Sequence, residues 1–200
     1  EIGLPLLNTG GAADFPASVG RPLPAFDVEL RNDEGIPVAV ENVGELWIKG
    51  LGMFDAYLSP WQPLDEVCVD GWFATGDIAI LDQDGDLRLV DRLREMVLVS
   101  GFNVYPRDVE DVLLAHPLVA AAAVVGRPHE VLGEEVVAYV ALRVDTHVDP
   151  ALVSQLLVTW CADQLAKHKR PREVHVVAAV PLTSVGKTDR KALRARLGSH

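Results

Sequence analysis

The residue of this chain best suited to act on an anion is Lys187, near its end. It follows Gly186 in residues 181–190, between an apolar run at 174–177 that is typical of a strand and a run at 191–197 that is typical of a helix. Because glycine gives a loop conformational freedom, the pattern predicts a mobile cation. Such a cation can stabilise negative charge that develops on a carboxylate or a phosphoryl group.

Two simpler interpretations compete with this one. Gly186-Lys187-Thr188 resembles the end of a P-loop, but that loop needs another glycine five residues before Gly186, so that successive N–H groups surround the phosphates. The chain has Pro181 there, and proline has no N–H, which argues against a P-loop. A Gly-Lys pair taken alone is most often a surface turn. Whether Lys187 is a functional cation or part of a surface turn therefore depends on the other motifs of the sequence.

Three other segments contain residues that could do chemistry. Asp77 ends residues 71–77, where a Thr-Gly-Asp turn at the mouth of a strand offers a carboxylate to a diol such as a ribose, although alone it is better explained as a locally bonded turn. Residues 91–106 alternate charges, enter an apolar run and reach Gly101, a pattern that a domain linker also explains. Residues 165–171 predict a helix end followed by a proline.

The charge is distributed unevenly along the chain. The 200 residues are 49% hydrophobic and 24% charged, with a net charge of −11, which is typical of a globular protein. Residues 1–91 contain 4 Lys or Arg against 17 Asp or Glu, a charge of −13, whereas residues 92–200 carry +2. This asymmetry predicts two structural units, and the acidic first part argues against a nucleic-acid partner.

The sequence also predicts what the chain lacks. It has no run of about 18 apolar residues, so we expect no transmembrane helix. It begins at Glu1 without a Met or a signal peptide, which indicates a piece of a longer protein. Cys68 and Cys161 lie far apart, and the histidines form no close pair, so we expect no metal site and a reducing, cytoplasmic setting.

Residues 20–90 predict short β-strands. Apolar and polar residues alternate over 26–30, a second strand is predicted at 45–50, and an Asp-Gly turn joins runs at 78–81 and 87–90. Strands of this length and spacing predict a small barrel or sandwich.

After Asp91 the pattern mixes helices with strands. The predicted elements are a helix beginning at Pro106, buried strands at 119–125 and 136–142, a helix capped by Asp149 with an apolar stripe of Leu152, Leu156, Leu157 and Trp160, a strand at 174–179, and a short helix from Asp189. This order predicts an α+β fold with a unit boundary near residues 90–94.

Together, residues 71–77, 91–106, 165–171 and 181–190 resemble four motifs of the adenylate-forming superfamily. This superfamily contains acyl-CoA synthetases, adenylation domains that load carrier proteins, and luciferases. Further matches are residues 18–22, 44–50, 124–128 and 133–134, so the resemblance covers about residues 18–197. Each motif alone is weak, but their order and spacing together are specific.

The resemblance implies two domains. Residues 1–91 would be the end of a large N-terminal AMP-binding domain, including a small β-barrel-like subdomain. Residues 92–200 would be a mobile C-terminal domain with a small sheet flanked by helices. The phosphate loop and most of the acyl pocket of the family would lie before Glu1.

The resemblance also implies a role for each motif residue in adenylation. Asp77 would hold the ribose hydroxyls of ATP, and Arg92 would contact the ribose region. Asn103 would place its amide near the nucleotide. Lys187 would be catalytic and bind ATP, bridging the substrate carboxylate and the α-phosphate.

A second group of residues would serve thioester formation. Arg94 would be the hinge at which the small domain rotates between two working positions. Ser100 and Gly101 would form the loop that replaces Lys187 for the second step and would bind coenzyme A. A side chain at Gly101 would obstruct the pantetheine arm of coenzyme A.

The implied function is an ATP-dependent acid–CoA ligase for a fatty acid or related carboxylic acid, working through acyl-AMP with ATP, Mg²⁺ and coenzyme A. The form of residues 103–106 favours acyl-CoA synthetases over amino-acid-activating domains. One alternative is an acyl-AMP ligase that loads a carrier protein, and another is a non-catalytic interaction module. Peripheral membrane contact stays open, and we expect the chain alone to be inactive.

Three departures from the family pattern bear on the acyl substrate. Ala56 stands where the family usually has Gly, Ala74 where it often has Arg or Lys, and Leu98 where some ligases carry Lys. None removes a catalytic group, but together they leave the acyl substrate open.

Overall fold

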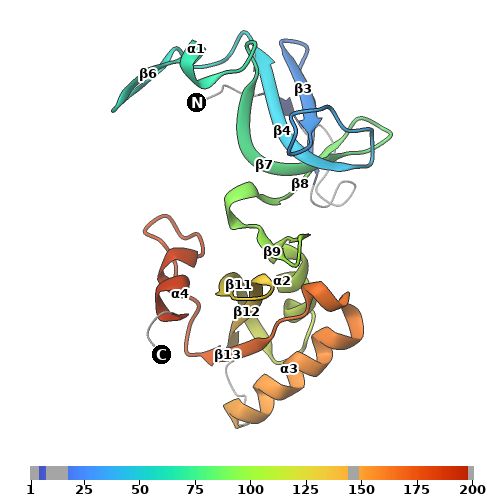
Figure 1. The fold of residues 1–200 in the computed structure, drawn as a ribbon, viewed down its shortest axis with the longest axis vertical. Helices are drawn as coiled ribbons and strands as arrows, with labels where there is room; N and C mark the ends of the chain where they lie inside the picture. The colour runs from blue at the N-terminus through green and yellow to red at the C-terminus, as the bar shows by residue number, and fades with distance from the viewer. Residues whose placement is uncertain (1–4, 8–17, 144–148, 198–200) are drawn as a thin grey trace. The chain divides into compact units, whose positions relative to one another are not determined.

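The structure is a computed structural model of the chain, and it describes residues 5–7, 18–143 and 149–197. The chain divides into two compact units, Glu1–Arg94 and Glu95–His200 (Figure 1). The boundary that we predicted between residues 91 and 92 lies three residues before this division. The fold is α+β, as predicted, with a curled sheet in the first unit and a smaller sheet with helices in the second.

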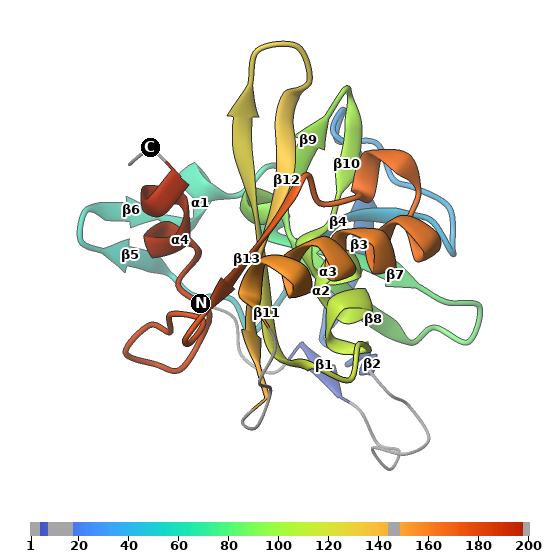
Figure 2. The ribbon, with the colours of Figure 1, turned by 90° about the horizontal axis from the view of Figure 1, so that it is seen from below.

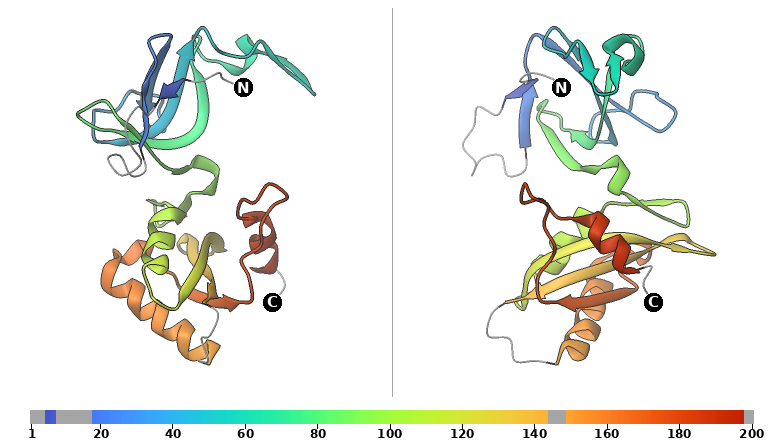
Figure 3. Two further views of the ribbon diagram at one scale, coloured as in Figure 1. Left: turned by 180° about the vertical axis from the view of Figure 1, so that it is seen from behind. Right: turned by 90° about the vertical axis from the view of Figure 1, so that its left-hand side faces the viewer.

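The first unit is built on a six-stranded antiparallel sheet. Its strand order is β1 (Leu6–Leu7), β2 (Ser18–Pro22), β8 (Leu87–Arg92), β7 (Phe73–Leu81), β4 (Val43–Gly50) and β3 (Phe26–Arg31). A hairpin of β5 (Ala56–Leu58) and β6 (Trp61–Pro63) precedes α1 (Leu64–Val67). The predicted strands at 26–30, 45–50, 78–81 and 87–90 are confirmed. Figure 3 shows the sheet curling around one face.

The apolar face of this sheet forms a small core of its own. Leu30, Leu46, Ile48, Ala79 and Leu87 are buried there. The predicted Asp84-Gly85 turn joins β7 to β8, and Gly85 has a φ of +83°, which glycine adopts at no steric cost. Local turn chemistry therefore sets the register of the two strands that contain Asp77 and Arg92.

The second unit mixes strands with helices. Its elements are η1 (Leu93–Glu95, which spans the division), β9 (Val97–Val99), β10 (Phe102–Val104), α2 (Pro106–Leu114), β11 (Val119–His129), β12 (Gly133–Leu142), α3 (Pro150–Gln164), η2 (Lys167–Lys169), β13 (Glu173–Val177) and α4 (Arg190–Leu197). The sheet has the order β10-β9-β12-β11, and β13 pairs in parallel with β12. Pro106 begins α2 and Asp149 caps α3, as predicted.

Side chains along β11 and β12 point alternately to the two faces of this sheet, and helices cover both faces, so each face has its own core. Val124 and Ala138 belong to the core shared with α2 and α3, whereas Val125 and Val137 belong to the core shared with Leu193 of α4. Figures 1 and 2 show α4 on the opposite side of the sheet from α2 and α3. The sheet therefore lies between α4 on one side and α2 and α3 on the other.

The predicted apolar stripe of α3 is wrong in part. Leu157 is fully buried, but Leu152 and Leu156 are 65% and 47% exposed, and the other buried positions are Val153 and Cys161. Apolar residues occur all around this helix, so their spacing does not select one face. Packing against β13 and α2 selects it instead.

This packing predicts different costs for two leucines of the same helix. Leu157→Ala should lower the free energy of unfolding of the second unit by about 2–5 kcal/mol, because it leaves a cavity in a closed core. Leu152→Ala, at an exposed position, should change it by less than about 0.5 kcal/mol. Native-state hydrogen exchange of α3 and β12 peptides measures both, and equal effects would contradict the packing.

In the described ranges, no helix has the length and apolar character needed to cross a membrane. Over the same ranges, no three His, Cys, Asp or Glu side chains are grouped so that they could hold a metal ion.

Candidate functional site

Asp77 lies on a bulge of a strand, and not on a turn as we predicted. Residue 74 of β7 pairs with Trp47, but the next pair along joins Ile78 to Glu45, so β7 has two more residues than β4 between these pairs. Gly76, at the bulge, has a φ of +72°. The bulge bends β7 and sets the direction of the Asp77 side chain. The Thr-Gly-Asp sequence indicated a local irregularity of the backbone, but pairing with β4 made that irregularity a bulge within a strand and not a turn.

Side chains from β4 and β7 hold the bulge in place. Glu45 accepts a hydrogen bond from the Gly76 N–H at 3.2 Å and another from the Trp47 indole at 3.0 Å. The Thr75 hydroxyl donates to the Leu46 carbonyl at 2.8 Å and accepts from the Asp77 N–H at 3.1 Å. The backbone groups that the bulge removes from the sheet ladder are thus satisfied by neighbouring side chains.

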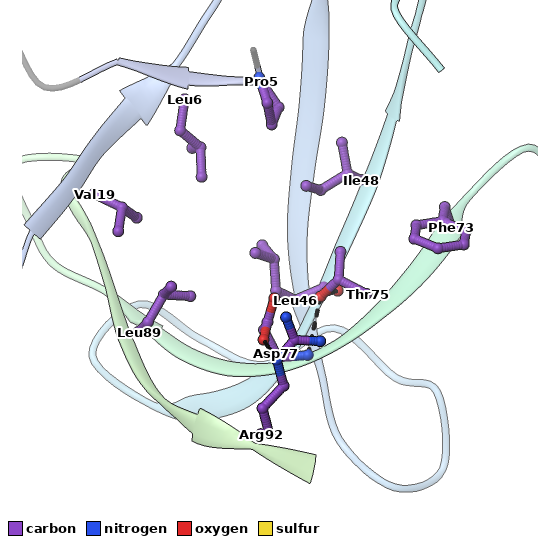
Figure 4. Close-up of a pocket in the computed structure, with 10 residues that line it drawn as sticks. All are labelled: Pro5, Leu6, Val19, Leu46, Ile48, Phe73, Thr75, Asp77, Leu89 and Arg92. Atoms are coloured by element: carbon purple, nitrogen blue, oxygen red, sulfur yellow. Dashed lines mark hydrogen bonds and ion pairs between the residues drawn. The ribbon is translucent and has the colours of Figure 1, made fainter. Parts of the chain in front are cut away.

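The structure brings Asp77 and Arg92 together across the end of β7 and β8. They are opposite each other in the strand register, and Arg92 Nε lies 2.6 Å from Asp77 Oδ1. Both side chains line a pocket of about 330 Å³ on the curled sheet, together with Thr75, Leu46 and Phe73 (Figure 4). A carboxylate and a guanidinium at the edge of an apolar wall could bind a polar sugar beside a flat ring.

Lys187 lies in a loop between β13 and α4, as predicted. Thr183 closes the loop: its N–H donates to the Lys187 carbonyl at 2.7 Å, and its hydroxyl accepts from the Lys187 N–H at 3.2 Å. Gly186, with a φ of +79°, donates its N–H to the Thr183 carbonyl. The Lys187 side chain is exposed, and within the described residues its ammonium has no hydrogen-bond or ion-pair partner. The fold therefore presents this cation at the surface, on a loop whose backbone is closed by hydrogen bonds.

The base of this loop is joined firmly to the sheet. The Asp189 carboxylate accepts a hydrogen bond from the Ala192 N–H and so caps the start of α4. Arg190 donates to Glu110 of α2 at 2.7 Å and to the Val124 carbonyl of β11 at 3.2 Å. Glu110 also accepts from the Val124 N–H at 2.8 Å. These contacts link three elements just after Lys187.

A second network fixes β13, the strand that leads into the Lys187 loop. Arg127 of β11 donates to Glu173 of β13 at 2.7 Å and to Glu135 of β12 at 2.6 Å. The guanidinium holds the pKa of the Glu173 carboxyl below its usual value, although burial acts in the opposite direction. Glu173 therefore stays ionised and paired in the folded unit at neutral pH.

Ser100 and Gly101 form the two-residue turn of the hairpin between β9 and β10. Their φ values are +51° and +83°, as a type I′ turn requires. Asn103 lies on β10, opposite Leu98, with its side chain exposed. A Cβ at Gly101 would meet no atom within 4 Å, so the turn conformation favours glycine here but packing does not.

The segment at 165–171 lies beside this hairpin. The His168 ring stacks on Phe102 of β10, with 4.8 Å between ring centroids. Lys169 forms an ion pair of 2.6 Å with Asp108 of α2. Figures 1 and 2 show the hairpin and the loop before α4 on separate parts of the second unit. Ser100, Gly101 and Asn103 therefore lie together on the β9–β10 hairpin. Lys187 lies in a different loop, before α4, on another part of the same unit.

Arg94 lies between two fixed residues. On one side, Arg92 is paired with Asp77 in the first unit. On the other, Glu95 is paired with Arg194 of α4 in the second unit at 2.7 Å. The division between the units follows Arg94 directly. The chain between these two ion pairs is residues 93–94.

Sequence reasoning missed three glutamates that support these sites. They are Glu45 under the bulge, Glu110 under the Lys187 loop, and Glu134, whose carboxylate accepts the Leu98 N–H. Glu45 and Glu134 belong to motifs that we had matched, and each is an acidic residue near the start of a largely apolar strand. That contrast was the available signal. Their partners lie far away in sequence and could not be read from it.

Comparison with known proteins identifies relatives of both units. Residues 108–187 match the family model of the AMP-binding enzyme C-terminal domain. The chain is 42% identical over 191 residues to a long-chain-fatty-acid–CoA ligase of Yersinia pestis, which covers 94% of this chain and 33% of that ligase. It is 41% identical over 182 residues to a medium/long-chain-fatty-acid–CoA ligase of Mycobacterium tuberculosis, covering 90% of this chain and 32% of that ligase. The chain thus spans about a third of the length of these relatives.

Solved structures show the same fold. An ATP-bound chimera of RpMatB and BxBclM has a TM-score of 0.84 at 31% identity, covering 92% of this chain and 37% of that one. The amide bond synthetase McbA from Marinactinospora thermotolerans has a TM-score of 0.77 at 38% identity, covering 90% of this chain and 36% of that one.

Proposed function

This chain belongs to the adenylate-forming superfamily as a C-terminal part of such an enzyme, and we propose that the complete protein is an ATP-dependent acid–CoA ligase. The observation that carries the proposal is the 42% identity, over 94% of the chain, to a long-chain-fatty-acid–CoA ligase. The substrate class that follows is a fatty acid or a related carboxylic acid. The reaction joins the acid to AMP and then transfers the acyl group to the thiol of coenzyme A.

For the first step, we propose that Asp77 and Arg92 bind the ribose of ATP and that Lys187 acts on the reacting groups. Attack of a carboxylate on the α-phosphate brings two anions together and releases pyrophosphate. A cation between them lowers this barrier by electrostatic stabilisation. The exposed ammonium of Lys187, on a loop closed by Thr183, supports this role. Asn103 would lie near the nucleotide in the same step.

For the second step, we propose that the β9–β10 hairpin takes the place of the Lys187 loop. Thioester formation needs no cation at the phosphate, but it needs space for the pantetheine thiol, which Ser100 and Gly101 would provide. Arg94 would be the hinge, because residues 93–94 lie between the Arg92–Asp77 and Glu95–Arg194 ion pairs. A few residues of this kind typically absorb a domain rotation.

Two domain roles belong to the same proposal. Residues 1–91 would be the end of the large AMP-binding domain, and residues 92–200 would be its mobile C-terminal domain. A cytoplasmic location also stays a prediction. We assign no Mg²⁺ ligand to the described residues, since they contain no suitable group of side chains, and Mg²⁺ would enter bound to the phosphates of ATP.

One alternative concerns the acceptor of the acyl group. The structural similarity to an amide bond synthetase is the observation that favours testing acceptors other than coenzyme A. An acyl-AMP ligase that loads a carrier protein would use the same first step. A non-catalytic interaction module would use neither step.

The test uses the complete protein. With ATP and fatty acids of increasing chain length, pyrophosphate release reports the first step, and mass spectrometry identifies the product formed with coenzyme A or with a carrier protein. We expect acyl-CoA. Transfer only to the carrier protein would favour the alternative ligase, and the absence of pyrophosphate release with all acids would contradict both. We expect the 200-residue chain alone to make no acyl-AMP.

A further inference from the structure

We infer that Glu134 is a positioning residue for thioester formation, acting through the hairpin that carries Ser100 and Gly101. The inference rests on the proposed function, and it adds a residue and a step-specific role to it. Three observations carry it: how the hairpin is attached, the space beside Gly126 of β11, and the bonding of the Glu134 carboxylate.

The first observation is how the hairpin is attached. The Leu98 N–H donates to Glu134 Oε2 at 2.8 Å, and the Ser100 N–H donates to the Leu132 carbonyl at 2.8 Å. Between them, Val99 pairs with Gly133, the one position at which β9 and β12 are paired in register. The Glu134 carboxylate thus extends a short strand pairing by one further hydrogen bond. The turn with Ser100 and Gly101 follows directly.

The second observation is that the neighbouring strand leaves room for this carboxylate. A Cβ built at Gly126 of β11 would lie 2.6 Å from Glu134 Oε1 and 3.0 Å from Val97 of β9. Gly126 is not among the glycines with positive φ, so its backbone conformation does not require glycine. Space for Glu134 and β9 is the physical reason for a glycine at this position.

The third observation separates Glu134 from an ordinary charged surface residue. Within the described residues it makes no ion pair, and its one hydrogen bond goes to a main-chain N–H. The adjacent Glu135 behaves differently, because it pairs with Arg127. A half-buried carboxylate that binds backbone, and not a cation, fixes the position of that backbone.

These contacts predict an effect mainly on the second step, although Asn103, which we assign to the first step, lies opposite Leu98 on the same hairpin. A displacement of about 1 Å in a positioned group can reduce a rate by about 100-fold. The Lys187 loop is held by separate contacts of Thr183 and Arg190, on the α4 side of the sheet. Loss of the Glu134 contact should therefore slow acyl transfer to the thiol much more than acyl-AMP formation, for which Asn103 is the one group that we assign on this hairpin.

The experiment measures both steps in the complete protein. In Glu134→Ala, acyl-CoA formation from supplied acyl-AMP should fall about 10- to 100-fold, while pyrophosphate release should fall by no more than about threefold. Glu134→Gln keeps a carbonyl oxygen that can accept the Leu98 N–H, so it should restore most of the rate. Gly126→Ala should reproduce the selective loss, because its methyl group pushes the flexible carboxylate away. Glu130→Gln, an exposed glutamate in the same β11–β12 turn, is the matched control and should change neither step.

Hydrogen exchange of the Leu98 amide gives a readout that does not depend on catalysis. We expect exchange about tenfold faster in Glu134→Ala than in the wild-type protein or Glu130→Gln. Unchanged thioester formation, or equal losses in both steps, would overturn the inference even if the wild-type protein is a ligase. If the wild-type protein forms no thioester, the proposed function fails and the role of Glu134 in thioester formation fails with it, while the exchange rates still report whether Glu134 holds the hairpin.

Discussion

Replacing Lys187 by alanine in the complete protein should reduce acyl-AMP formation by about 10²–10³-fold, or about 3–4 kcal/mol, and leave thioester formation from supplied acyl-AMP unchanged. The reason is electrostatic, because the ammonium would stabilise charge that develops only while pyrophosphate leaves. The free energy of unfolding should change little, since the side chain is exposed and the loop is closed by backbone and Thr183 contacts. Pyrophosphate release and acyl-CoA formation, measured separately, give the two rates.

A matched control lies four residues further along. Lys191 of α4 is also an exposed lysine, so Lys191→Ala removes the same charge from the same region. It should leave both steps within about twofold of the wild-type rate. Unchanged pyrophosphate release in Lys187→Ala would rule out the role assigned to this lysine. Equal losses in the two lysine variants would indicate a general charge effect.

The second large effect is expected in the opposite step. Gly101→Leu should abolish thioester formation and spare acyl-AMP formation, because a side chain at this turn would obstruct the pantetheine arm. Inside the second unit, a Cβ at this position meets nothing within 4 Å, so the first atom of the new side chain causes no clash. The remaining cost to the fold is that of a positive φ, about 1–2 kcal/mol.

That conformational cost can be controlled closely. Gly85, in the β7–β8 turn, also has a φ of +83° and also has open space around its Cβ position. Gly85→Leu therefore strains the backbone to a similar degree, outside the residues assigned to either step. We expect near wild-type rates for Gly85→Leu in both assays. If it lost thioester formation as completely as Gly101→Leu, obstruction of the thiol would not be the cause.

Elements that depend on nearby residues were predictable from the sequence. The Asp84-Gly85 turn, Pro106 at the start of α2 and the Asp149 cap of α3 each depend on contacts within a few residues. The loop position of Lys187 followed from the glycine before it and the apolar runs on both sides. The family resemblance also came from the order of the motifs, and the comparisons confirm it. The roles of individual site residues stay predictions.

What only the tertiary structure decided depends on residues distant in sequence. The tertiary structure placed Asp77 on a bulge, because the number of residues between paired positions differs between β4 and β7. It selected the buried face of α3, which apolar spacing could not do in a helix that is apolar all around. It joined Glu134 to Leu98, and Arg190 to Glu110, across 36 and 80 residues of chain. A sequence specifies which groups can hydrogen-bond, but only the packed sheet determines which of them meet.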